Sequence, residues 1–201
     1  MEIIFATGNQ HKVVEAQKAL GDSFALIMPK ELGLTEEIPE DGDTLEKNAI
    51  QKAEYLWNRF GKNCFADDTG LEVEDLGGAP GVYTARYAGA GKGDDANMAK
   101  LLEELAKVEA QKGKIGRKAR FRSVVALIID GQVKTFEGIL EGRISTARCG
   151  SEGFGYDPVF VPQGYSCTLA EITLDEKNAI SHRGKAMRAL AQYLNNIRDA
   201  H

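Results

Sequence analysis

The stretch Cys64-Phe65-Ala66-Asp67-Asp68-Thr69-Gly70-Leu71 sets both the fold and the chemistry of this 201-residue chain. Its apolar lead-in predicts a buried strand, and its Thr-Gly pair predicts a tight turn before a second short strand over 71–75. Two carboxylates at a buried strand end are costly to desolvate unless cations or hydrogen-bond donors meet them. Because successive strand residues face opposite ways, Asp67 and Asp68 need not share one role. A surface turn capped by aspartate is the alternative interpretation.

Composition limits the class of protein. The content of 43% hydrophobic and 27% charged residues is typical of a soluble globular protein, and the length suits one domain over residues 1–201. The net charge of −5 disfavours nucleic acid as a partner. Cys64, Cys149 and Cys167 fit neither a disulfide framework nor a zinc site, so we expect a cytoplasmic location. No leader opens the chain, and no apolar run approaches the roughly 18 residues of a membrane span, so no membrane association is expected.

The chain opens with a pattern suited to binding phosphate. A strand over 2–6 runs into Thr7-Gly8-Asn9 and then a helix with apolar residues at helical spacing, closed by Gly21. A helix N-terminus presents free backbone N–H groups to an anion. Lys12 in the first turn is unfavourable beside the positive end of the helix dipole, and an anionic ligand would explain it. The spacing is not that of a P-loop, and a plain strand–helix turn stays open.

Further elements follow from periodicity and turn residues. We expect strands over 24–28, 121–130 and 133–143, the last two joined by Asp130-Gly131, and a helix that begins at Asp43 and ends at Gly61. Within that helix Lys52 lies beside the apolar stripe, where a snorkelling lysine is the default. The run from Lys112 to Arg122 is the only basic one; we favour a solvated connector there over a nucleic-acid contact.

Two segments near the C-terminus carry special residues. In Gly153-Phe154-Gly155-Tyr156-Asp157-Pro158 the glycines let backbone approach a flat ligand, while Phe154 or Tyr156 supplies a stacking face. Lys177, His182 and Arg183 lie near expected turns or helix starts, as Lys12 does. In an acidic protein, the simplest common reason for these cations is a polyphosphate ligand.

Five motifs together carry a family resemblance. They are Thr7-Gly8-Asn9-Gln10-His11-Lys12, Ala66-Asp67-Asp68-Thr69-Gly70, Leu76-Gly77-Gly78-Ala79-Pro80-Gly81, Gly153-Phe154-Gly155-Tyr156-Asp157-Pro158 and Ser181-His182-Arg183-Gly184. In this order the chain resembles the Ham1-like inosine triphosphate pyrophosphatases, also called dITP/XTP pyrophosphatases, from residue 3 to about 195. The resemblance implies a mixed α/β fold with an elongated twisted sheet, flanking helices and two lobes around a central cleft. It also implies a homodimer that hydrolyses ITP, dITP and XTP to the monophosphate and pyrophosphate with Mg²⁺.

The resemblance assigns roles position by position. Asp68 would be the proton acceptor and a Mg²⁺ ligand, with Glu40 a second metal ligand and Thr69 replacing a serine common in bacterial members. The rest would bind the purine nucleoside triphosphate. Its triphosphate would be held by Thr7, Gly8, Asn9, Gln10, His11 and Lys12, and Lys52 and Thr69 would also contact the substrate. Its base and sugar would be held by Phe154, Gly155, Tyr156 and Asp157, and the base pocket would be completed by Lys177, His182 and Arg183.

The residues also indicate how such chemistry would work. Mg²⁺ and lysines would neutralise the triphosphate, and a carboxylate would orient or deprotonate the water that attacks the α-phosphorus. Arg183 and His182 can donate hydrogen bonds to the 6-oxo group of hypoxanthine or xanthine but face a donor in adenine. The structural alternative is that Arg183 caps a neighbouring carbonyl or pairs with Asp157. A catalytically silent nucleotide-binding module and an RNA-binding protein remain the rival functions.

Overall fold

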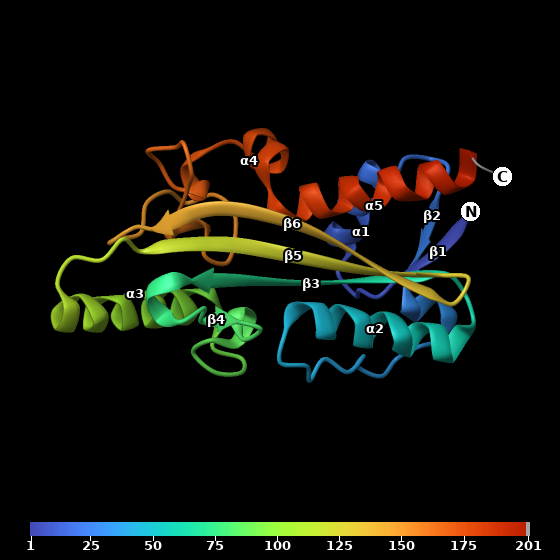
Figure 1. Cartoon of the computed structure of the whole chain (residues 1–201), viewed down its shortest axis with the longest axis horizontal. Coiled ribbons are helices and arrows are strands. Elements are labelled where there is room, and N and C mark those ends of the chain that lie inside the picture. The colour runs from blue at the N-terminus through green and yellow to red at the C-terminus, as the bar shows by residue number, and fades with distance from the viewer. Residues whose placement is uncertain (200–201) are drawn as a thin grey trace. The chain divides into compact units, whose positions relative to one another are not determined.

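The computed structural model describes residues 1–199, apart from the side chain of His11. It is a mixed α/β fold, as expected (Figure 1). The strands are β1 (Glu2–Phe5), β2 (Ala25–Ile27), β3 (Cys64–Val73), β4 (Pro80–Gly81), β5 (Lys118–Ile129), β6 (Gln132–Ile144) and β7 (Phe160–Pro162). The α-helices are α1 (Gln10–Leu20), α2 (Leu45–Phe60), α3 (Gly93–Lys112), α4 (Leu174–Ile180) and α5 (His182–Asp199).

The strands form one seven-stranded sheet in the order β2-β1-β3-β5-β6-β7, with β4 also paired to β3. Strand β1 runs parallel to both β2 and β3, whereas the β3–β4 and β6–β7 pairs are antiparallel. Asp130 and Gly131 have φ values of 49° and 78°, as a two-residue hairpin turn of type I′ requires. The predicted hairpin between β5 and β6 is therefore confirmed.

The chain divides into two compact units. Unit 1 comprises Met1–Asp68, Ser123–Gly138 and His182–His201, and unit 2 comprises Thr69–Arg122 and Ile139–Ser181. Two lobes were expected; the cleft between them stays a prediction.

The core of unit 1 covers both faces of its part of the sheet. Helices α1 and α5 lie on one face, and α2 lies on the other (Figure 1). Phe65 of β3 stacks on Phe5 of β1, with ring centroids 4.3 Å apart, in the cluster that contains α1 and α5. Cys64 points the other way, and its Sγ donates to the carbonyl of Ala53 in α2 over 3.3 Å. This alternation continues along β3, so its next polar residues also face different helices.

The core of unit 2 is built on one side of the sheet by α3. Met98, Leu101 and Leu105 of this helix pack with Leu71 and Val73 of β3. Burial of these apolar side chains is the main stabilising contribution of the unit.

The predicted turn at Thr69-Gly70 is wrong. Strand β3 runs without interruption from Cys64 to Val73, and both residues lie inside it. The apolar alternation resumes at Leu71 and Val73, which are buried, and the strand pairs with β1 near its start and with β4 near its end. Pairing at both ends favours an extended conformation for the glycine, although glycine also permits a turn.

Smaller differences concern element boundaries. Helix α2 is capped by Thr44, not Asp43: the Thr44 side chain accepts a hydrogen bond from the backbone N–H of Lys47 at 3.1 Å. Strand β5 begins at Lys118, three residues before the expected start, because Ala119 joins Phe121 in the core. The short helix α4 was not predicted, and Lys177 lies near its end, not near a helix start.

Candidate functional site

The turn before α1 is held by its own polar side chains. The backbone N–H of Asn9 donates to Thr7 Oγ1 over 3.1 Å, and the N–H of Lys12 donates to Asn9 Oδ1 over 3.4 Å. Asn9 therefore caps the first turn, while α1 itself begins at Gln10. Open space surrounds Gly8, where an added Cβ would meet no atom within 4 Å. The His11 side chain lies outside the described residues. This is a helix N-terminus of the kind that binds anions.

Asp67 faces α1 and α5. Lys12 Nζ contacts both of its carboxylate oxygens, at 3.0 and 2.8 Å, and Arg183 Nε lies 3.8 Å from Oδ2. The Asp67 side chain is only 1% exposed. Burial raises the pKa of this carboxyl, but Lys12 and Arg183 together hold the pKa below its ordinary value. Asp67 is thus a buried anion with two cationic neighbours.

Asp68 faces α2 instead. Lys52 Nζ lies 3.3 Å from Asp68 Oδ1 and 2.8 Å from Glu40 Oε2, and Asn48 Nδ2 donates to Asp68 Oδ2 over 3.1 Å. Burial raises the pKa of Asp68, and the carboxylate of Glu40 raises it further; Lys52 and Asn48 oppose the shift without reversing it. Burial lowers the pKa of Lys52, but the Asp68 and Glu40 carboxylates outweigh it and the pKa is raised. The snorkelling expected of Lys52 is wrong, because its ammonium group is buried between two carboxylates.

The donor set on this face is suited to a magnesium ion. Among the described residues, no group of three or more His, Cys, Asp or Glu side chains could hold a metal. Mg²⁺ does not need such a group, since it is usually bound by one or two carboxylates, by substrate phosphates and by water. Asp68 and Glu40 already converge on one cation, the Lys52 ammonium. Two carboxylate oxygens that face one positive charge are the kind of ligand arrangement that would bind a metal ion.

The base-binding loop predicted around Phe154 lies in unit 2, where Asp157 organises it. Asp157 is buried, accepts a hydrogen bond from the backbone N–H of Phe154 at 2.9 Å, and forms a salt bridge with Lys177. The Lys177 ammonium also lies 4.3 Å from the centroid of the Phe154 ring. The N–H of Gly155 donates to Asp94 Oδ2 over 2.8 Å, which ties the loop to the start of α3.

The two aromatic residues of this loop have different environments. Phe154 is 64% exposed, whereas Tyr156 is buried and its hydroxyl donates to the carbonyl of Thr84 over 2.7 Å. Of the two candidates for a stacking face, only Phe154 offers one. Tyr156 is a core residue that supports the loop.

The predicted residues fall into three groups of contacts. Unit 1 brings Lys12 and Arg183 to Asp67, and it brings Lys52 and Glu40 to Asp68. Unit 2 brings Phe154 and Lys177 to Asp157. Thr69, Gly155 and His182 adjoin these groups in sequence. The alternative pairing of Arg183 with Asp157 is wrong, because Lys177 is the cation that pairs with Asp157 and Arg183 lies near Asp67 and Glu15.

Sequence reasoning missed three polar residues of these groups. Asn48 binds Asp68, Glu15 lies 3.5 Å from Arg183, and Asp94 holds the loop of unit 2. Asn48 could have been found, because it precedes Lys52 by four residues and therefore shares its helix face. Glu15 and Asp94 carry no local signal that separates them from other exposed carboxylates.

Only part of the basic run is a solvated connector: Lys112, Lys114 and Lys118 are exposed, whereas the three arginines are held by the fold. Arg117 is buried, donates to the carbonyls of Ile144 and Ser145, and pairs with Glu109. Arg120 and Arg122 both pair with Glu72 of the neighbouring strand. Three of the six cations therefore form ion pairs within the fold, which weakens the RNA-binding hypothesis.

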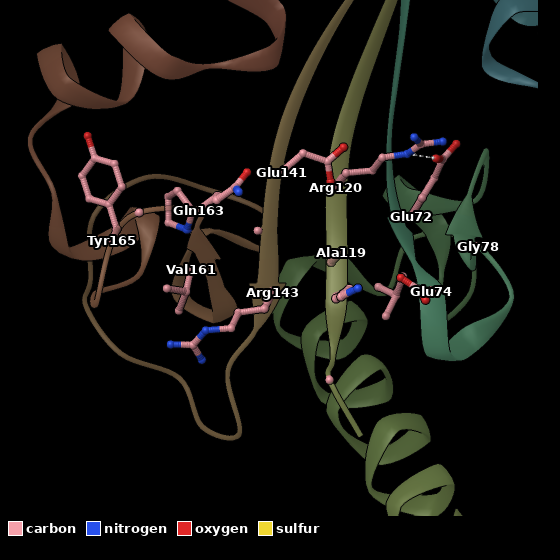
Figure 2. A pocket seen from close by; sticks show the side chains of 16 residues that line it. Glu72, Glu74, Gly78, Ala119, Arg120, Glu141, Arg143, Val161, Gln163 and Tyr165 are labelled. Atoms are coloured by element: carbon pink, nitrogen blue, oxygen red, sulfur yellow. Dashed lines mark hydrogen bonds and ion pairs between the residues drawn. The ribbon is translucent and has the colours of Figure 1, made fainter. Parts of the chain in front are cut away.

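A cavity of about 850 Å³ lies elsewhere in unit 2, along β3, β5, β6 and β7. Figure 2 shows charged side chains from several strands around it, including the Arg120–Glu72 pair, and Arg143. None of the predicted site residues lines this cavity.

Comparison with known proteins identifies the family. A model of the Ham1 family matches residues 3–193. The chain belongs to the Ham1 family. The dITP/XTP pyrophosphatase of Porphyromonas gingivalis is 49% identical over 193 residues, which cover 96% of this chain and 97% of that protein. The dITP/XTP pyrophosphatase of Flavobacterium psychrophilum is 47% identical over 98% of this chain and all of that protein.

Solved structures of Ham1 proteins share the fold. A HAM1 protein from Coxiella burnetii superposes with a TM-score of 0.91 at 36% identity, over 98% of this chain and 99% of that one. The Ham1 protein of Staphylococcus aureus gives a TM-score of 0.89, also at 36% identity and with the same coverage. These matches confirm the family and the fold predicted from the five motifs.

Proposed function

We infer that the chain is a nucleoside triphosphate pyrophosphatase, a hydrolase that acts on dITP, XTP and ITP and releases pyrophosphate. Family membership supports the reaction class, and similarity to the dITP/XTP pyrophosphatases of Flavobacterium psychrophilum and Porphyromonas gingivalis supports dITP and XTP as substrates. The observation that carries the proposal is the pair of adjacent carboxylates on β3, each turned to a different face and each bound to its own lysine.

The face of Asp67 supplies the triphosphate contacts. The N-terminal turn of α1 offers backbone N–H groups to phosphate oxygens, and Lys12 adds a charge beside them. Two of the ammonium protons of Lys12 can bond the Asp67 oxygens, which leaves one for the substrate, and the side chain is 25% exposed. Thr7 and Asn9 fix the turn that places these donors.

The face of Asp68 supplies the catalytic group. Asp68 would orient or deprotonate the water that attacks the α-phosphorus, because its pKa is raised toward the working range of a general base. Asp68 and Glu40 would hold Mg²⁺, which when bound would stabilise negative charge on the phosphates. Lys52 holds both carboxylates in place and adds positive charge for the transition state.

Base selection would use the loop of unit 2 and the start of α5. Phe154 supplies the stacking face, and Asp157 with Lys177 fixes the loop around it. Arg183 and His182 would donate to the 6-oxo group of the purine. Adenine presents an amino donor there, and a buried donor left unpaired costs about 1–3 kcal/mol, which gives roughly tenfold to hundredfold discrimination.

Product analysis in labelled water tests the reaction. With Mg²⁺ and ITP or XTP in ¹⁸O water, we expect monophosphate and pyrophosphate in one step, with the label in the monophosphate. Label in pyrophosphate would place the attack at the β-phosphorus. A nucleoside diphosphate and orthophosphate as primary products would overturn the proposal, and binding without turnover would favour the silent nucleotide-binding module.

Three further properties belong to the same proposal. We expect dependence on Mg²⁺, which would appear as loss of turnover with chelator. We also expect a homodimer in sedimentation and a cytoplasmic location, where free thiols such as that of exposed Cys149 stay reduced. Among the described residues no helix has the length and apolar character needed to cross a membrane.

A further inference from the structure

Asp67 joins three elements of unit 1 through one carboxylate. It lies on β3, Lys12 comes from α1, and Arg183 comes from the first turn of α5. Lys12 Nζ bonds both oxygens, at 3.0 and 2.8 Å, while Arg183 Nε lies 3.8 Å from Oδ2. The carboxylate is therefore shared unequally between two cations that have different proposed roles.

The link between Asp67 and Arg183 is weaker than a hydrogen bond. Arg183 Nε is buried and has no hydrogen-bond partner among the described residues, so its attraction to Asp67 acts across a gap longer than a hydrogen bond. Its Nη1 lies 3.5 Å from Glu15 Oε2, at the limit of hydrogen bonding. A guanidinium held between two carboxylates at these distances is sensitive to the charge that each presents.

We propose that Asp67 is a positioning residue that couples the phosphate-binding Lys12 to the base-selecting Arg183, so that selectivity for 6-oxo purines depends on Lys12. The coupling rests on the proposed function for its biological meaning. Its physical basis is that Lys12 neutralises much of the charge that Asp67 would otherwise direct at Arg183. Lys12 thereby leaves the guanidinium free to face the base.

Removing either partner should therefore move Arg183. In Lys12→Ala the Asp67 carboxylate loses its closest cation, and Arg183 becomes the nearest one, since Lys52 acts on Asp67 only from a longer range. Arg183 Nε is then drawn into a direct hydrogen bond with Asp67 and away from the purine. In Asp67→Asn the guanidinium loses its anchor and turns toward Glu15. Both changes lower base selectivity, although Lys12 is proposed to touch only the triphosphate, which is identical in ITP and ATP.

The test compares kcat/KM for ITP and for ATP in the wild type, Lys12→Ala, Asp67→Asn, Arg183→Ala and Lys12→Ala/Arg183→Ala. We expect Arg183→Ala to reduce the ITP/ATP ratio about tenfold. Lys12→Ala and Asp67→Asn should each reduce it about fivefold. The double variant should have no lower ratio than Arg183→Ala, because the two residues act through one contact. Lys52→Met, which removes a cation on the other face, should slow both substrates and leave the ratio unchanged.

An equal loss on ITP and ATP in both Lys12→Ala and Asp67→Asn would overturn the coupling. Thermal unfolding shows whether Asp67→Asn is folded; if it is not, Lys12→Ala alone decides. Limited acetylation with mass spectrometry gives a readout that needs no turnover: Lys12 should react several-fold faster in Asp67→Asn than in the wild type, with exposed Lys47 as the internal reference. Unchanged Lys12 labelling would refute the positioning role. A wild type that hydrolyses no ITP but shows this protection would refute only the proposed function.

Discussion

Replacing Lys52 by methionine tests whether Asp68 and Glu40 form a cation site. Methionine keeps the apolar stem of the side chain but removes the ammonium group, which lies 2.8 Å from Glu40 and 3.3 Å from Asp68. The Asp68 side chain is 15% exposed, so the change leaves a buried carboxylate whose charge is no longer balanced by Lys52. Glu40 is 41% exposed and remains hydrated. The cost therefore comes mainly from Asp68.

The magnitude follows from these exposures. Breaking a buried ion pair costs about 3–5 kcal/mol, and hydration of Glu40 places this change at the lower end, about 3 kcal/mol. For a chain of this length each kcal/mol lowers Tm by about 2–4 °C, so we expect a decrease of about 6–12 °C near pH 7. The penalty requires ionised Asp68, so it is present above the pKa of Asp68 and is lost as the pH falls below it.

Thermal unfolding with chelator and with Mg²⁺ in excess is the assay. Mg²⁺ should raise the Tm of Lys52→Met by more than that of the wild type, because a metal bound by the two carboxylates no longer competes with the lysine. Lys47→Met is the matched control on the same helix, since Lys47 is 65% exposed and its salt bridge is with exposed Asp43. A Tm decrease no larger than that of the control, or equal stabilisation of both variants by Mg²⁺, would refute the cation site.

Three further comparisons separate catalysis, stacking and packing. Asp68→Asn should lower turnover of ITP at least about a hundredfold with no loss of Tm. In the wild type, kcat should rise with pH through the raised pKa of Asp68. Retained turnover in the variant would exclude Asp68 as the general base. Phe154→Ala should raise KM about tenfold, because the exposed ring no longer stacks on the base. Tyr156→Phe should lower the free energy of unfolding by about 1 kcal/mol, because the hydrogen bond to the Thr84 carbonyl is lost, and should leave KM unchanged. The reverse pattern would exchange the roles of the two residues. Gly138→Ala should lower the free energy of unfolding by about 1–3 kcal/mol and raise KM, because the added Cβ would overlap the backbone of His182 and Ala186 at the start of α5. The control is Gly116→Ala, whose added Cβ would make an ordinary contact with Lys118. Equal Tm values for the two variants would refute this close packing.

Alternation along β3 was predictable from the sequence, and it decides the roles of the two carboxylates. Adjacent residues in a strand face opposite sides, so Asp67 and Asp68 had to meet different partners whatever the fold. The structure adds which helix lies on each side. That depends on sheet order and crossovers, which bring residues 12 and 183 to one face and residue 52 to the other.

Two local patterns gave wrong predictions, because each sequence is compatible with more than one conformation. Thr69-Gly70 suits a turn, yet pairing of β3 with β1 and β4 keeps it extended. The basic run from Lys112 to Arg122 suits a solvated segment, yet Arg117 is buried because the carbonyls of Ile144 and Ser145 need donors there. In both cases long-range partners outweigh the local preference.

Motifs, turn residues and hydrophobic periodicity are local properties, so the family, the reaction class it implies and the order of most elements could be predicted from the sequence. Which charges meet could be learned only from the three-dimensional structure. Lys12 was predicted as a phosphate ligand, and the structure shows that it is also the counter-ion of Asp67. Lys52 was expected to snorkel, and it lies between Glu40 and Asp68. The physical reason is that the pairing of a buried charge depends on residues far apart in the chain, and their proximity is a property of the fold.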